Sequence, residues 1–203
     1  MLPVPISPAT VALLGAVLCL LLAHHSKIDT VSNILGDVDW STLLFFMSIF
    51  VLIGGLQHTG VLSSAAGVLA WLLGKNIALG AIVLLFSVGL ISSVVPTIPL
   101  VVAMVPLLKE YIVNAGFVGA EILVPGSTLP LPPEVLPLFY AMMYGATVGG
   151  NGTLVGASAN VVAAGISEQH GKPISFQRFL YYGLPTMGLQ LLVLAAYVSI
   201  AFL

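Results

Sequence analysis

Long apolar runs separated by short polar segments follow one another along the chain. A helix needs roughly 20 mainly apolar residues to cross about 30 Å of hydrocarbon. Because lipid offers the backbone no hydrogen-bond partners, such spans are expected to be helical. The runs at 6–25, 40–57 and 179–203 are therefore predicted transmembrane spans. The run at 59–73, with about 15 residues, is short for a crossing and predicts a short or interfacial helix, or a tightly turned return.

The first of these runs has an alternative interpretation as a secretory signal peptide. A signal peptide begins with a basic region, but here Pro3, Pro5 and Pro8 stand at the place of that region. We therefore interpret 6–25 as a retained span.

Two further apolar stretches carry no charge and are interrupted near their centres. In the stretch 79–108, Pro96 and Pro99 follow a pair of serines. Proline lacks a backbone donor and clashes with the preceding helical turn. Two half-helices are therefore expected to meet at a polar tip between Ser92 and Pro99.

The second interrupted stretch, 135–166, follows a loop at 113–134 that is rich in glycine and proline. Its centre, GGNGTLVGASAN (149–160), contains glycines and asparagines, which weaken a helix. Unpaired backbone at membrane depth is tolerated only where it is buried in protein or lines a wet cavity. The stretch thus predicts a broken helix with a functional or buried centre.

Composition narrows the class of protein. The 203 residues are 59% hydrophobic and 6% charged, where a soluble chain has about 25% charge, and the mean hydropathy is +1.16. With a net charge of −2, the chain lacks the excess of basic residues by which proteins bind the phosphates of nucleic acid. Cys19 is the one cysteine, so no intramolecular disulfide or cysteine metal cluster can form. A Ser-His-Asp set, an HExxH motif or a phosphate-binding loop would indicate an enzyme, and the sequence contains none of these motifs. The sequence predicts an all-α, multi-pass integral membrane protein without a catalytic site or bound metal.

Discontinuous helices near the membrane midplane are typical of transporter sites. Half-helix N-termini offer N–H groups and a positive dipole end to an anion, and unwound carbonyls with side-chain oxygens can replace the water around Na⁺. The candidate ligands are the neutral polar side chains of the two interruptions: Ser92, Ser93, Thr97, Asn151, Thr153, Ser158 and Asn160. The alternative is that these small residues only allow helices to pack closely.

Three blocks resemble a known group of membrane transporters. GGNGTLVGASANVVAAGISEQHGKPISFQRFLYYGLPTMGLQLL (149–192), DVDWSTLLFFMSIFVLIGGLQHTGVL (37–62) and SSVVPTIPLVVAMVPLLK (92–109) occur in the expected order. They are similar to blocks of the ArsB/P-protein/NhaD-like, citrate-transporter-like families, in particular to the C-terminal half of a member.

The resemblance implies a fold of two inverted repeats, each with a re-entrant hairpin and a broken helix around a mid-membrane site. Residues 78–112 would be the hairpin and 135–168 the broken helix of one repeat. It further implies a secondary transporter of a small anion or ion, coupled to Na⁺ or H⁺, in the plasma membrane. No other cofactor is expected.

Two departures from the group affect this expectation. An Asp-Asn pair usually precedes the hairpin Ile-Pro, whereas Pro96 and Thr97 stand here. The chain also matches only one repeat. The missing repeat would come from a separately encoded N-terminal half, or from a second copy in a homo-oligomer. The alternatives are a non-transporting membrane subunit, a truncated remnant, or a passive channel.

Overall fold

The described part of the chain is built from helices. The computed structural model describes residues 8–28, 30–36, 38, 40–124 and 129–202; 79% of the structure is helical, and no strand occurs among the described residues. Positions 6–7 and 203 of the predicted spans, and 125–128 of the predicted loop, lie outside the described residues. The all-α fold class is therefore confirmed, and the structure is that of a membrane protein.

The chain divides into two units, residues 1–47 and 48–203. The first contains α1 (Pro8–His25), α2 (Val31–Gly36) and the start of α3 (Trp40–His58). In this unit the Trp40 indole donates a hydrogen bond to the Leu35 carbonyl across 2.9 Å. Most side chains of α1 are exposed, including large apolar ones such as Leu13, as expected for a helix that faces lipid.

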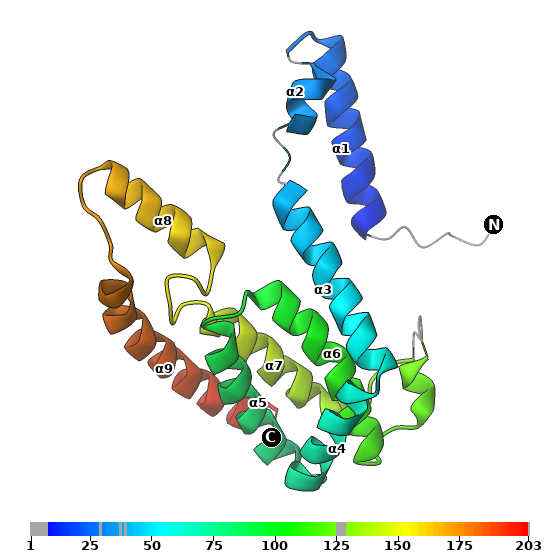
Figure 1. Ribbon diagram of the computed structural model, residues 1–203. Helices are drawn as coiled ribbons and strands as arrows, with labels where there is room; N and C mark the ends of the chain where they lie inside the picture. Colours follow the sequence, from blue (N-terminus) through cyan, green and yellow to red (C-terminus); the bar gives the residue numbers. More distant parts are fainter. Residues whose placement is uncertain (1–7, 29, 37, 39, 125–128, 203) are drawn as a thin grey trace, which may run out of the picture. The chain divides into compact units, whose positions relative to one another are not determined.

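The second unit holds the remaining helices. They are the end of α3, α4 (Val61–Leu73), α5 (Ile77–Ser92), α6 (Thr97–Asn114), the short 3₁₀ turns η1 (Ala120–Leu123) and η2 (Pro133–Val135), α7 (Leu136–Gly149), α8 (Ser158–Gln169) and α9 (Phe176–Ala201) (Figure 1). α3 and α4 form a pair bent by 68°, with Gly60 in the left-handed region (φ 74°) at the break. Glycine suits this position because it has no Cβ.

Among the described residues, two helices are long and apolar enough to cross a membrane, α6 and α9, and the bent pair of α3 and α4 adds a third if it forms one span. Two further apolar helical stretches, Ala9–His25 of α1 and Ile77–Ser92 of α5, are shorter. The range 78–112, predicted as a re-entrant hairpin, contains α5 and α6 joined by a turn at 93–96. The range 135–168 contains α7 and α8, separated by a non-helical segment at 150–157.

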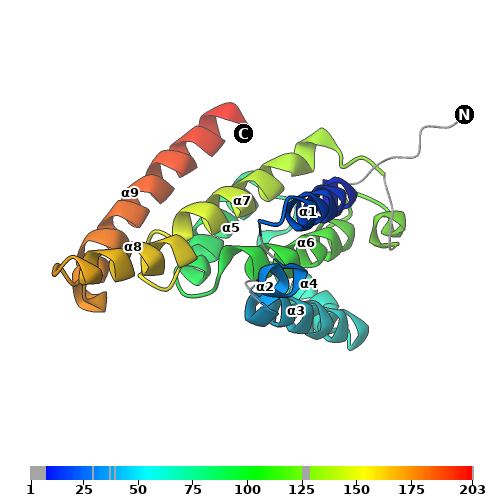
Figure 2. The same ribbon diagram turned by 90° about the horizontal axis from the view of Figure 1, so that it is seen from above.

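The core of the second unit lies around α7, which packs against α5, α6 and α9. α5 and α7 run side by side in both views (Figures 1 and 2). Their fully buried side chains include Leu85, Val88, Leu138 and Met142. At the far end of α7, Tyr140 stacks on Phe202 of the C-terminal turn, with ring centroids 4.9 Å apart. α9 is thereby held along the helix that precedes the break.

Glycine sets the distance between α5 and α7. A Cβ at Gly145 would lie 2.4 Å from the Leu85 carbonyl oxygen, and one at Gly149 would lie 2.2 Å from the Gly89 oxygen. Both obstacles are backbone atoms, which cannot rotate away. The close packing of small residues is a common way for membrane helices to associate, and here it brings two helix backbones into direct contact.

We expect Gly145→Ala to separate α5 from α7 and to destabilise the protein by about 1–3 kcal/mol, since overpacking against backbone forces the helices apart. The measurement is the thermal unfolding midpoint in detergent. Gly188→Ala on α9 is the matched control, because nothing lies within 4 Å of a Cβ there. An unfolding midpoint for Gly145→Ala equal to that of the control would contradict the proposed role of this contact.

Candidate functional site

The two interruptions meet in space. α5 ends at Ser92 and α6 begins at Thr97, while α7 ends at Gly149 and α8 begins at Ser158. The connecting segments, 93–96 and 150–157, touch through the buried Thr153 hydroxyl, which donates a hydrogen bond to the carbonyl of Ser93. We call this meeting of four helix ends the junction.

One backbone carbonyl group of α7 accepts hydrogen bonds from both α5 and α6, the two helices of the 78–112 range. Ser92 and Thr97 both donate hydroxyl hydrogen bonds to the Ala146 oxygen, at 2.5 and 3.1 Å. Ser92 is fully buried and Thr97 is half-buried. The last residue of α5 and the first of α6 are therefore fixed to the same point on α7, one turn before its end.

Asn160 holds the segment between α7 and α8 in shape. Its amide nitrogen donates to the carbonyls of Gly150 and Thr153, at 2.9 and 3.1 Å. The Thr153 hydroxyl also accepts a hydrogen bond from the Gly156 N–H at 3.1 Å. These bonds satisfy backbone groups that lie outside any helix, which an apolar surrounding requires.

Helix α9 completes the junction, and sequence reasoning did not include its residues. A Cβ at Gly183 would lie 2.8 Å from the carbonyl oxygens of both Asn151 and Gly152. Two turns further, the Gln190 side-chain oxygen accepts a hydrogen bond from the Asn151 amide at 3.0 Å. Gly183, Met187 and Gln190 recur at helical spacing and therefore lie on one face of α9. This periodicity is the signal in the sequence from which their place at the junction could have been predicted.

The predicted site residues thus divide into two groups. Ser92, Ser93, Thr97, Thr153 and Asn160 come together at the junction and are bonded to backbone carbonyls, the hydroxyl of Ser93 within its own helical turn. Asn151 and Ser158 are exposed at its edge, and Asn151 also lines a cleft beside α9. Whether these seven residues bind a transported species stays a prediction.

The junction offers dipoles and oxygens but no formal charge. No ionisable Asp, Glu, Lys, Arg or His side chain occurs in 77–108 or 135–167. The N-cap residues of α6 and α8, Pro96 and Ala157, form no side-chain cap, so the positive ends of two helices meet here. α5 and α7 end at the same place and contribute carbonyl groups. Such an arrangement can hold a small anion at the amide ends and a small cation at the carbonyl ends.

Comparisons with known proteins find one family model and several relatives. Residues 1–129 match the family model described as citrate transporter (CitMHS). An uncharacterized transporter of Synechocystis sp. is 72% identical over 198 residues, covering 98% of this chain and 44% of the relative. The human P protein is 39% identical over 196 residues, covering 94% of this chain and 21% of the relative.

A third relative, an uncharacterized transporter of Mycobacterium tuberculosis, is 34% identical over 197 residues, covering 97% of this chain and 42% of the relative. The chain thus spans less than half the length of these relatives. No solved structure matches it. The family model ends before α7, whereas the alignments to the relatives cover nearly the whole chain, including most of the residues that form the junction.

We expect Thr153→Val to leave the Ser93 carbonyl without its donor and to destabilise the protein by about 1–3 kcal/mol. The reason is that the group stays buried after its partner is removed. Thr153→Ser keeps the hydroxyl and serves as the control. Thermal unfolding in detergent measures the difference, and equal midpoints for the two variants would show that this bond does not hold the junction together.

Proposed function

This chain belongs to the citrate transporter family, and we propose that its junction forms part of the substrate site of a secondary active transporter. The family and the names of the relatives support a transporter role. The observation that carries the proposal is the meeting of two uncapped helix N-termini with two helix C-termini at a break in otherwise apolar helices.

The transported species we propose is a small anion or ion. The amide ends of α6 and α8 favour negative charge, and the absence of a basic side chain in 77–108 and 135–167 avoids a permanent ion pair that would slow release. A neutral site of this kind can load and empty without leaving an unpaired charge in the membrane. Exposed Asn151 and Ser158 are the side chains placed to contact such a ligand.

Na⁺ fits the junction better than H⁺ as the coupling ion. Carbonyl groups at the ends of α5 and α7, with neighbouring hydroxyl oxygens, are the hard ligands that a small cation prefers. Proton coupling needs a group that titrates, and neither 77–108 nor 135–167 contains a carboxylate or histidine. We therefore propose Na⁺ coupling, with H⁺ coupling as the alternative.

Transport would follow alternating access, in which one repeat moves against its partner around the site. We propose that the facing repeat comes from a second copy of the chain in a homo-oligomer or from a separately encoded N-terminal half. The exposed side of the junction, where Asn151 and Ser158 lie, is the surface for that partner and for the substrate between them.

A second candidate is a membrane subunit that does not itself transport. It is favoured by the hydroxyls of Ser92, Thr97 and Thr153, which all donate to backbone carbonyls and thereby serve packing. It is also favoured by the neutral Pro96 and Thr97 before the Ile-Pro of the predicted hairpin.

Uptake into proteoliposomes that contain this purified chain separates the two candidates. The probes are citrate, succinate, arsenite and an internal pH indicator with an imposed Na⁺ gradient. We expect saturable uptake of one probe that follows the Na⁺ gradient. Flux that stays unsaturated would indicate a passive pore. Absence of flux from folded protein, also after co-expression with any adjacent membrane gene, would favour the subunit.

We expect Asn151→Ala to reduce uptake at least about tenfold while membrane insertion and the unfolding midpoint stay close to wild type, because loss of one good polar contact corresponds to about 1.4 kcal/mol. Asn160→Ala should lower both uptake and stability, since Asn160 binds two backbone carbonyls.

Asn114→Ala, an exposed asparagine at the other end of α6, is the matched control for both changes. Wild-type kinetics in Asn151→Ala and Asn160→Ala would contradict the assignment of the site to the junction, whatever the transported species.

A further inference from the structure

A cleft of about 820 Å³ opens between the end of α8, the loop that follows it and the first three turns of α9. Its walls include Pro173, Ile174 and Phe179, and along α9 it extends as far as Thr186. These apolar residues and two glycines line it beside polar ones such as Ser167. The cleft shares Asn151 and Gly183 with the junction, but the proposed transport function does not use the residues at its other end.

Two cations line this cleft. Lys172 lies in the loop and Arg178 in the first turn of α9. Neither side chain has an ion-pair or hydrogen-bond partner among the described residues, and no carboxylate is among the residues that line the cleft. Glu168, the acidic residue near them in sequence, lines an adjoining cleft on the other side of Pro173 and Ile174, which line both clefts. The cleft itself therefore carries two basic groups and no acidic one.

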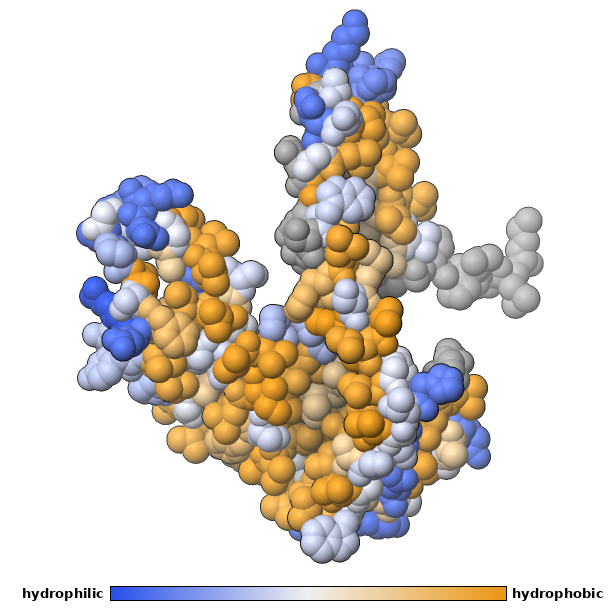
Figure 3. All heavy atoms as spheres, in the orientation of Figure 1, coloured by the Kyte–Doolittle hydropathy of each residue, from blue (hydrophilic) through white to orange (hydrophobic). Residues whose placement is uncertain are grey.

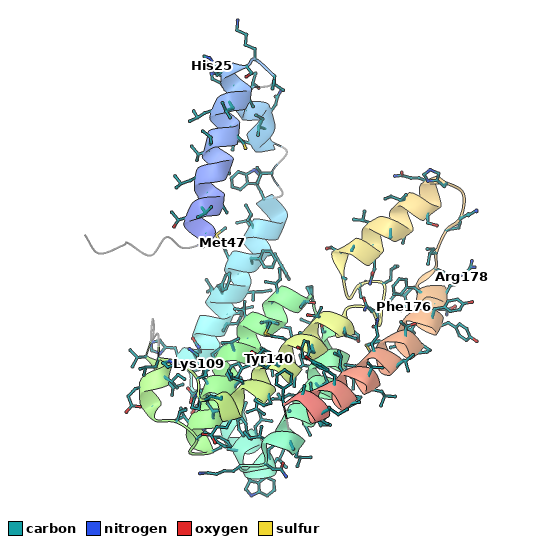
Figure 4. All side chains as sticks on the ribbon, turned by 180° about the vertical axis from the view of Figure 1, so that it is seen from behind. His25, Met47, Lys109, Tyr140, Phe176 and Arg178 are labelled. Carbon is teal, nitrogen blue, oxygen red and sulfur yellow. The ribbon has the colours of Figure 1, made fainter. Side chains whose placement is uncertain are left out.

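The cleft lies at the start of a candidate membrane span. α9 is apolar and long enough to span the bilayer, and it begins at Phe176, so a spanning α9 would bring the loop before it to the level of the lipid headgroups. Tyr181 and Tyr182 are 75% and 64% exposed on the next turn, as is typical of interfacial aromatic residues. Figure 4 shows Phe176 and Arg178 together at this end of the helix.

The hydropathy of the surface changes at the same level. Hydrophilic residues gather around the ends of α8 and α9 and the loop between them, and hydrophobic residues cover the helices beyond (Figure 3). A ligand in this cleft would therefore have one end among cations and the other against apolar side chains.

We propose that the cleft binds one anionic phospholipid. The headgroup phosphate lies between Lys172 and Arg178, and an acyl chain follows Ile174 and Phe179 toward Thr186. Arginine suits a phosphate because its planar guanidinium donates two parallel hydrogen bonds, and basic pockets between membrane helices bind anionic headgroups. A small soluble anion would satisfy the cations but leave the apolar walls without a partner.

The test measures binding of phosphatidylglycerol and phosphatidylcholine to the detergent-purified chain by native mass spectrometry. We expect a preference for phosphatidylglycerol that falls about fivefold in Lys172→Gln, and by a similar factor in Arg178→Gln, since each basic group near the surface contributes about this much. Lys109→Gln on α6 removes the same charge at a different cleft and is the matched control.

A second variant tests the apolar part of the cleft without changing charge. Thr186→Phe fills the part of the cleft that lies farthest along α9, so it should weaken binding of long-chain phosphatidylglycerol and leave binding of a short-chain form unchanged. Circular dichroism and size-exclusion chromatography establish that each variant is folded.

Two outcomes would overturn the proposal. Equal losses in Lys172→Gln, Arg178→Gln and Lys109→Gln would show a general attraction of anionic lipid to positive charge. Displacement of phosphatidylglycerol by inorganic phosphate or citrate at low concentration, with no effect of Thr186→Phe, would show a site for a soluble anion. Neither outcome bears on the junction, so the transport proposal is tested separately.

Discussion

The structure depends on how it satisfies the backbone where two apolar helices are interrupted. In hydrocarbon an unpaired N–H or C=O group costs several kcal/mol, so a break at membrane depth must bring its own hydrogen-bond partners. Here each of the two breaks takes part in hydrogen bonds with the backbone of the other segment. Ser92 and Thr97 bind the carbonyl of Ala146 on α7, and Thr153 of the second break binds the carbonyl of Ser93 in the first. Within the second break, Asn160 and the Thr153 hydroxyl bind further backbone groups, so bonds inside this break add to those between the breaks.

Close contact between helix backbones makes these bonds possible. Gly145 and Gly149 allow α7 to touch α5, and this places the Ala146 oxygen within reach of two hydroxyls at the tip of the other segment. Gly183 has the same effect on the opposite side, where α9 meets the carbonyls of the second break. The glycines therefore allow the helix backbones to come close together, and the hydroxyl groups form hydrogen bonds across the short distance that results.

Charge is distributed to suit a protein that works inside a membrane. The junction contains only neutral groups and helix ends, whereas Lys172 and Arg178 stand at the polar end of α9. A neutral site lets an ion enter and leave without stranding an opposite charge. In the proposed lipid site, these two cations would attract an anionic headgroup.

The sequence by itself determined the membrane class, the all-α fold and the two polar interruptions, because these follow from local composition and from the effects of proline and glycine on a helix. Its quoted blocks also identified the family. It did not reveal that Asn151 pairs with Gln190, that Gly183 admits the broken segment, or that Lys172 and Arg178 share a cleft. Those relations join residues of different elements, and nothing in local composition encodes them. Only tertiary packing decided which hydroxyls bind backbone and which polar groups stay exposed, since backbone distances between helices set both.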